Sequence, residues 1–412
     1  MRKKILAISF IAIMLLSACA VNTEPRQMAL PTAAIVDVSE VPNETWAAMA
    51  DFSQELFRQV LLLNDDENVV ISPLSAYYAL TMAALGANGV TLDEFANLLR
   101  REPVDLAPEL AGLAQSLMSV GGRTMLNLAG SVWVNDEFTV HPSFNRVMTD
   151  YFSAPAFPRD FSNEEALLAE INAWIYDKTN GLIGEMIDEI PADAVMYLIN
   201  TLYMLARWSD AFYPMTKTVR TFTPENGETR RVDFVNTRTV ALDVRVTNAY
   251  EAVLLPYDCG RLGFFMVRPT NGTPIREFAA NHNLANTFAR LEQRDEVRVF
   301  MPTLDKEFDI EMNDMLKAMG LVTAFTQNAD FMGLVEYSPE PIEISTVQQA
   351  VRIIVDAYGT EAAAATVVEM IAGSARPQPE PLVLDFNTPY IYAIYDLMTG
   401  VPLFMGVVDN PN

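Results

Sequence analysis

Side chains that commonly carry chemistry are scarce in this chain of 412 residues, which contains two histidines and two cysteines. A Ser-His-Asp hydrolase would need His141 or His282 as its general base. His141 is followed by a proline, His282 lies between two asparagines, and no nucleophile motif adjoins either histidine. Cys259, in a turn-like Tyr-Asp-Cys-Gly segment, has no partnering base in its neighbourhood. We therefore expect neither an enzyme nor a catalytic cysteine.

Cys19 indicates a different chemistry, the attachment of a lipid. Three basic residues precede the apolar stretch 5–16, whose roughly 12 residues are fewer than the ~20 that a membrane-spanning helix needs. The stretch ends in Leu-Ser-Ala-Cys at 16–19, which resembles the bacterial lipobox, in which the cysteine thiol carries a diacylglyceryl anchor. The alternative is an ordinary secretory signal with an incidental cysteine.

We accordingly expect a signal peptide over residues 1–18, and a lipidated Cys19 with a flexible tether over residues 19–44, where prolines recur without hydrophobic periodicity. Such a protein would be exported and held at the bacterial cell envelope or cell surface by its lipid anchor alone. Lipidation of Cys19 would leave Cys259 as the one free thiol, so no intramolecular disulfide is expected.

Composition and charge narrow the class of protein and its partners. Half of the residues are hydrophobic and 10% are aromatic, which is enough for a substantial core. The formal charge is −25, and no run of basic residues offsets it. Binding of nucleic acid depends on clustered Lys and Arg, so neither a nucleic acid nor a heparin-like polyanion is expected as a partner.

Hydrophobic periodicity predicts helices early in the chain and strands late. A helix is expected just after residue 45, others open at Ser72-Pro73 and Thr91, and a further one follows Ser162. Strand-like runs lie at 126–134, 195–203, 252–255, 262–267, 298–301, 347–355, 390–397 and 403–408. This order favours an α+β fold, and without a proline-rich linker we expect one large domain over residues 45–412.

Several motifs, spread along most of the chain, carry a resemblance to a known family. They are Asn68–Ser75, Ile171–Trp174, Asn200–Tyr203 with Trp208, Ala329–Leu334, Phe386–Tyr390 and Pro402–Gly406. With these motifs, in this order, the sequence resembles the serpin family from about residue 46 to its end.

The resemblance implies a serpin fold, which is a single large α+β domain. A central, mostly antiparallel sheet, further sheets and about eight or nine helices are expected, with an exposed reactive loop at about residues 357–383. The resemblance also implies a monomer that inhibits a serine or cysteine protease by forming a covalent complex. It implies no cofactor, no metal and no catalytic residue of its own.

One segment resembles the hinge of inhibitory serpins. It consists of Gly359, Thr360, Glu361, Ala362, Ala363, Ala364, Ala365 and Thr366. Its composition alone favours a helix, because alanine is the best helix former, whereas inhibition requires this segment to become a strand. With a period of two, the even-numbered residues from Thr360 to Met370 share an uncharged face. A slip by one residue would bury Glu361 and Glu369 instead.

The position of the scissile bond follows from the resemblance. In the family it lies about 13 residues after the hinge threonine, which here gives Gly373 followed by Ser374. Ala372, Ala375 and Arg376 are alternatives. The peptide nitrogen after Arg376 belongs to a proline and lacks its N–H, which makes that bond a poor protease substrate. The small residues favour a protease with an open or shallow specificity pocket.

Other residues match positions that control opening of the family's central sheet. Ser72, Ser75 and Asn200 resemble the polar cluster where the sheet parts, and Trp208 matches the aromatic residue under the start of insertion. Gln349 stands where the family often has a histidine, and its amide can form hydrogen bonds but does not titrate. Ser72 as a helix cap and Trp208 as a core residue are the simpler interpretations.

Two other functions compete with inhibition. A non-inhibitory serpin would act as a carrier, chaperone or storage protein, but such members tend to have bulky, charged or proline residues where this chain has Ala362 to Ala365. A lipid-anchored binding protein is the second alternative, since the tether alone permits it. The small hinge residues favour inhibition.

Overall fold

Helices precede most strands in the computed structural model, which describes residues 26–154, 156–184, 187–190, 194, 196–338, 341–360 and 380–411. This order confirms the α+β class. The nine α-helices of the described residues are α1 (Asn43–Leu63), α2 (Pro73–Ala84), α3 (Gly89–Leu99), α4 (Pro103–Met118), α5 (Pro142–Phe152), α6 (Glu164–Lys178), α7 (Ile275–Asn281), α8 (Leu284–Phe288) and α9 (Asn313–Ala318).

The larger sheet has ten strands and includes the last strands of the chain. Its order is β1-β18-β17-β10-β9-β8-β11-β7-β6, and β16 pairs with β11 in parallel. The strands are β1 (Asn68–Ile71), β6 (Thr216–Phe222), β7 (Arg230–Asn236), β8 (Val240–Val246), β9 (Tyr250–Pro256), β10 (Leu262–Pro269), β11 (Glu292–Pro302), β16 (Leu382–Asp385), β17 (Tyr390–Asp396) and β18 (Pro402–Val408).

The six-stranded sheet is the one that positions the hinge. Its order is β12-β14-β15-β5-β2-β4, and β14 also pairs with β5 directly. Most of its pairings are antiparallel, but β14 with β5 and β2 with β4 are parallel. The strands are β2 (Thr124–Asn135), β4 (Phe157–Arg159), β5 (Met196–Arg207), β12 (Leu304–Glu311), β14 (Thr346–Val355) and β15 (Gly359–Thr360). A third sheet pairs β3 (Thr139–Val140) with β13 (Val335–Tyr337).

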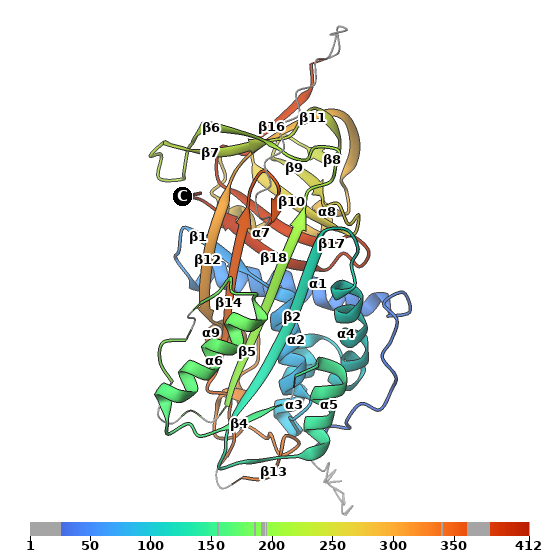
Figure 1. Cartoon of the computed structure of the whole chain (residues 1–412), viewed down its shortest axis with the longest axis vertical. Helices are drawn as coiled ribbons and strands as arrows, with labels where there is room; N and C mark the ends of the chain where they lie inside the picture. The colour runs from blue at the N-terminus through green and yellow to red at the C-terminus, as the bar shows by residue number, and fades with distance from the viewer. Residues whose placement is uncertain are drawn as a thin grey trace, which may run out of the picture.

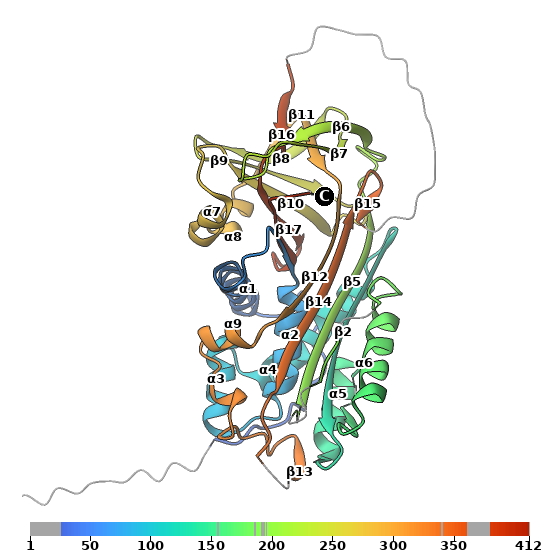
Figure 2. The same cartoon turned by 90° about the vertical axis from the view of Figure 1, so that its left-hand side faces the viewer.

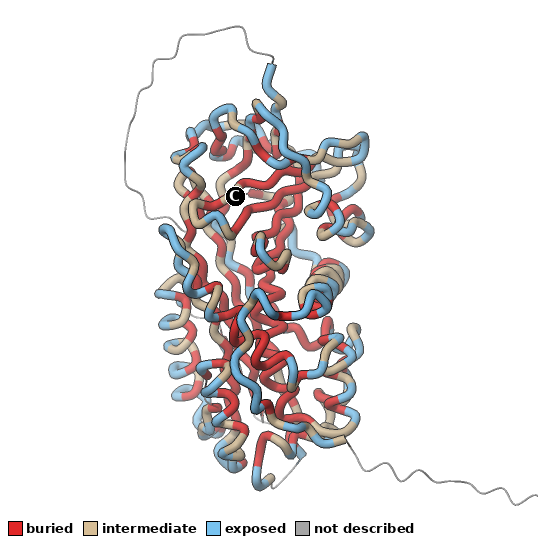
Figure 3. The backbone as a smooth tube through the Cα atoms, turned by 90° about the vertical axis from the view of Figure 1, so that its right-hand side faces the viewer, coloured by how far each residue is buried: buried red, intermediate tan, exposed pale blue. Residues whose placement is uncertain are grey.

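The molecule is elongated, and the long strands of the six-stranded sheet run up its lower half (Figure 1). Helix α6 covers one face of this sheet, and α2 lies on the other, with α3 and α9 on the same side (Figure 2). The ten-stranded sheet forms the upper half. Buried backbone runs through both halves, so one continuous interior joins them (Figure 3).

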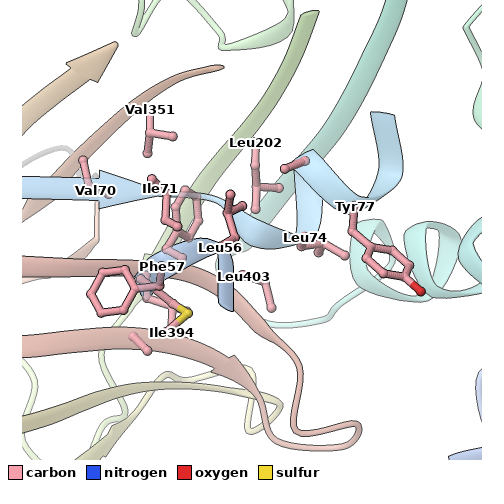
Figure 4. Close-up of a cluster of buried hydrophobic side chains, with 14 of the residues drawn as sticks. Leu56, Phe57, Val70, Ile71, Leu74, Tyr77, Leu202, Val351, Ile394 and Leu403 are labelled. Atoms are coloured by element: carbon pink, nitrogen blue, oxygen red, sulfur yellow. The ribbon is translucent and has the colours of Figure 1, made fainter. Parts of the chain in front are cut away.

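Helix α2 lies at the centre of the core, and every one of its residues is buried. It begins where the sequence predicts, with Ser72 as its cap and Pro73 as its first residue. Side chains of α1, β1, β5, β14, β17 and β18 meet around it (Figure 4). Those labelled in the figure are Leu56, Phe57, Val70, Ile71, Leu74, Tyr77, Leu202, Val351, Ile394 and Leu403. The two sheets therefore share one helix as support.

Candidate functional site

The start of the predicted hinge is a tight turn after β14. The Asp356 carboxylate accepts hydrogen bonds from the backbone N–H groups of Tyr358 (2.7 Å) and Gly359 (3.2 Å), and the Asp356 N–H donates to the Gly359 carbonyl (2.9 Å). A Cβ atom at Gly359 would lie 2.0 Å from the Ala206 carbonyl oxygen. Only glycine fits this close approach of two backbones.

Thr360 lies between β14 and β5 and is 3% exposed. It is opposite Val355 of β14 and Ala206 of β5. Its hydroxyl lies 2.6 Å from the hydroxyl of Tyr257, and burial raises the pKa of Tyr257, which keeps that phenol neutral. A side chain at the start of the hinge is thus already inside the sheet.

Trp208 contacts the turn that precedes Thr360. Its ring is fully buried and stacks on the Tyr257 ring, with centroids 4.8 Å apart and planes within 5°. Its indole N–H donates to the Asp356 carbonyl (2.9 Å), and its backbone N–H donates to the Tyr358 carbonyl (3.0 Å). Tyr257 escaped prediction because it lies in a segment whose Asp, Cys and Gly residues indicate only a turn.

The four predicted polar residues form one buried cluster lower in the sheet. The Gln349 side-chain NH₂ lies within donating distance of the Asn200 side-chain oxygen (2.7 Å), the Ser75 hydroxyl (2.9 Å) and the Ser72 carbonyl (2.9 Å). The Gln349 carbonyl oxygen accepts from the Ser72 N–H (2.9 Å), and the Ser75 hydroxyl donates to the Asn200 side-chain oxygen (2.8 Å). Ser72 also caps α2, so both interpretations of this residue hold.

The cluster lies at the upper end of the direct pairing between β5 and β14. That parallel ladder runs from the pair Tyr197–Thr346 to the pair Asn200–Gln349. Above it, residues 201–205 of β5 and 350–354 of β14, all of them described, are not paired with each other. Thr360 closes the top of this unpaired stretch, and the polar cluster closes the bottom.

Several predicted residues lie outside the described part of the chain. They are Cys19, the hinge residues Glu361, Ala362, Ala363, Ala364, Ala365 and Thr366, and the candidate bond residues Ala372, Gly373, Ser374, Ala375 and Arg376. The described strands that flank the loop, β15 (Gly359–Thr360) and β16 (Leu382–Asp385), are in the upper part of the molecule (Figure 2).

The histidines have local roles. His141 caps α5, with its Nδ1 atom 2.6 Å from the hydroxyl of Ser143 two residues on. The His282 ring stacks on Phe278 and contacts Thr287, and burial lowers the pKa of this imidazole. Cys259 is a free, partly buried thiol. Within the described ranges there is no cluster of three or more His, Cys, Asp or Glu side chains able to hold a metal ion, and none of the helices there is long and apolar enough to cross a membrane.

Comparison with known proteins identifies the family. The family model described as Serpin (serine protease inhibitor) matches residues 47–411. The chain belongs to the serpin family, whose members are generally protease inhibitors, although some are non-inhibitory. The predicted fold class is thereby confirmed.

Relatives span nearly the whole chain. Neuroserpin of Gallus gallus is 26% identical over 389 residues, which cover 90% of this chain and 92% of the relative. An uncharacterized serpin-like protein of Thermococcus kodakarensis is 29% identical over 371 residues, covering 88% of this chain and 85% of the relative.

Solved structures show the same architecture. The thermophilic serpin tengpin in its native state superposes with a TM-score of 0.82 at 29% identity, covering 93% of this chain and 97% of that chain. Thyroxine-binding globulin in complex with thyroxine superposes with a TM-score of 0.79 at 22% identity, covering 90% and 100%. The second likeness shows the fold alone.

The polar cluster predicts a large difference between two neighbouring glutamines. Gln349→Leu removes the amide that several buried polar groups share, so we expect the free energy of unfolding to fall by about 2–4 kcal/mol. Gln348→Leu is the matched control, because its amide donates to the exposed Asp309 on the other face of the sheet, and we expect a loss below about 1 kcal/mol. Urea unfolding of both variants measures this difference. Equal losses would contradict the role assigned to the cluster.

Proposed function

We propose that this serpin inhibits a serine or cysteine protease as a suicide substrate. The protease nucleophile attacks the carbonyl carbon of Gly373, and the bond to the nitrogen of Ser374 breaks. That nitrogen leaves with a proton as a new amino terminus, while residue 373 stays on the protease as an ester or thioester. The freed segment after Thr360 then inserts between β5 and β14, before water can release the protease.

The register of Thr360 supports this proposal. Thr360 faces Ala206 and Val355 at once, as one residue of an antiparallel strand between them. Extending that strand without a change of register places residue 366 opposite both Asn200 and Gln349. These two residues already face each other in the β5–β14 ladder. The hinge can therefore continue into the sheet directly. Only the ladder that joins residues 197–200 of β5 to residues 346–349 of β14 would have to separate.

The chemistry of the two faces supports the same register. The residues of β5 that share a face with Ala206, such as Leu202 and Leu198, are buried in the main core. Inserted residues on that face would be Ala362, Ala364, Thr366, Val368 and Met370.

Among these inserted residues Thr366 alone is polar, and it would lie beside the polar cluster of Asn200 and Gln349. Its hydroxyl would find hydrogen-bond partners there, while Glu361 and Glu369 would be on the opposite face. A polar side chain therefore meets the polar part of the core and small apolar side chains meet the rest.

We also propose that Cys19 carries a diacylglyceryl anchor and that the protein acts at the cell envelope or cell surface of a bacterium. The support is the basic segment, the short apolar stretch and the Leu-Ser-Ala-Cys motif at 16–19. The target would be a protease with a shallow specificity pocket, because the residues around Gly373 are small.

Inhibition is tested with an elastase-type and a subtilisin-type serine protease. We expect wild-type protein to give a covalent complex that survives denaturing electrophoresis. Thr360→Arg should be cleaved with little or no complex. The unpaired guanidinium would be expelled from the buried position between β5 and β14, and returning it there during insertion costs several kcal/mol, of which each 1.4 kcal/mol slows insertion about tenfold.

Glu361→Arg is the matched control, since this neighbouring side chain would lie on the outer face and the variant should keep the wild-type complex yield. Wild-type yield from Thr360→Arg would show that this hinge does not insert as proposed. Cleavage of wild-type protein without any complex would favour a carrier function.

The anchor is tested by Cys19→Ser. We expect this variant to stay uncleaved and to lose acyl labelling in a bacterial host, because the thiol that accepts the lipid is gone. Cys259→Ser should retain wild-type labelling. Labelling that persists in Cys19→Ser would refute the assignment.

A further inference from the structure

The segment that precedes α1 lies against the body of the protein. Residues 26–42, here called the strap, belong to the segment 19–44 that the sequence predicts to be a flexible tether. That prediction is wrong for the strap, because hydrogen bonds and ion pairs hold it to the body. At its start the Arg26 guanidinium forms ion pairs with Asp93 (2.9 Å) and Glu102. The Arg26 carbonyl accepts from the Gly89 N–H (2.6 Å). The beginning of the strap is thus bound to α3 and to the start of α4.

Further contacts hold the strap along its length. The Met28 N–H donates to the side-chain oxygen of Asn88 (3.0 Å), and the Tyr151 hydroxyl donates to the Ala33 carbonyl (2.6 Å). The Val36 N–H donates to the Pro108 carbonyl of α4 (3.1 Å). These bonds come from three different parts of the chain, so the strap has a defined path.

Gly112 permits the closest crossing of the strap over α4. A Cβ atom at this position would lie 1.8 Å from the Val36 carbonyl oxygen. Any other residue would push the strap off the helix. A glycine inside a helix costs about 1 kcal/mol relative to alanine, and here the strap backbone occupies the space that a side chain would take.

The strap changes where the chain leaves the body. Helix α1, where the strap ends, is at about mid-height, whereas the strap begins near α3 and α5 at the lower end (Figures 1 and 2). Strands β15 and β16, which flank the reactive loop, are in the opposite, upper part of the molecule (Figure 2). The strap thus carries the exit of the chain from the side of the molecule to the end farthest from the loop.

We propose that the strap orients the protein on a lipid bilayer, with the lower end toward the membrane and the reactive loop away from it. This inference rests on the proposed lipid anchor at Cys19. Six residues separate Cys19 from Arg26, and at about 3.4 Å per residue they keep the lower end within about 25 Å of the anchor. The excess of acidic over basic residues, 53 against 28 in the full sequence, also repels anionic headgroups, which opposes lying flat.

The orientation is measured by energy transfer from two labelled sites to an acceptor lipid. The lipidated protein, carrying Cys259→Ser, is bound to vesicles of phosphatidylglycerol and phosphatidylethanolamine. A donor dye is placed by Glu380→Cys at the upper end or by Glu336→Cys on β13 at the lower end; both residues are exposed. The strands between them, of which β5 alone spans about 40 Å, separate the two heights. We expect several-fold greater transfer from the lower site.

Releasing the strap should remove this difference. In the double variant Arg26→Glu with Gly112→Leu, a negative charge would face Asp93 and Glu102, and a side chain at position 112 would occupy the place of the strap backbone. The two labelled sites should then give similar energy transfer. Arg58→Glu combined with Gly121→Leu is the matched control, because Arg58 is a comparably exposed, ion-paired arginine and Gly121 has open space around it. This control should keep the wild-type ratio, and circular dichroism checks that all variants are folded.

Two outcomes would overturn the proposal, and they are distinguishable. Equal transfer from both sites in wild-type protein that floats with the vesicles would refute the orientation while leaving the anchor intact. Protein that does not float with vesicles, and whose Cys19 carries no lipid by mass spectrometry, would refute the anchor and the orientation together. Neither outcome bears on the formation of a covalent complex with a protease.

Discussion

The pairing between β5 and β14 governs the rest of this structure. The two strands are parallel neighbours over four residue pairs at the bottom of the sheet, and they separate above Asn200 and Gln349. Thr360 occupies the top of the space between them. A parallel pair that is joined at one end and held apart at the other can accept an antiparallel strand along its whole length. The first two hinge residues, Gly359 and Thr360, are the start of that strand.

Different chemical groups hold the upper and lower ends of the space between β5 and β14. At the top, a stacked pair of aromatic rings and one hydroxyl contact position Thr360. At the bottom, amide and hydroxyl groups of Ser72, Ser75, Asn200 and Gln349 satisfy one another without any charge. Because Gln349 does not titrate, this closure does not depend on a protonation state, unlike one built on histidine.

Much of this arrangement can be predicted from the sequence, because buried strands and family motifs leave clear patterns. Runs such as 126–134, 347–355 and 403–408 are strands, and Ser72-Pro73 starts a helix. Strand β12 was missed because charged residues separate its apolar ones. A search for continuous apolar runs does not detect such an alternating strand.

Predictions failed where side chains have distant partners. A helix is expected to open at Thr91, yet α3 begins at Gly89. The Thr91 hydroxyl instead accepts from the Asp330 N–H, and Glu94 accepts from the N–H groups of Val322 and Thr323. Contacts with residues more than 200 positions away leave no local signal. The same holds for the packing of the strap on α4 and for the contact of Tyr257 with Thr360.

Thermal unfolding of intact and loop-cleaved protein in the same buffer tests most directly whether the sheet is built to accept the loop. Insertion adds ladder hydrogen bonds on both sides of a new central strand, at about 0.5–1.5 kcal/mol each, and it fills the unpaired stretch between β5 and β14. Ordering the inserted residues opposes this gain. We expect the cleaved protein to unfold at a temperature higher by tens of degrees. An unchanged or lower midpoint after cleavage would contradict insertion.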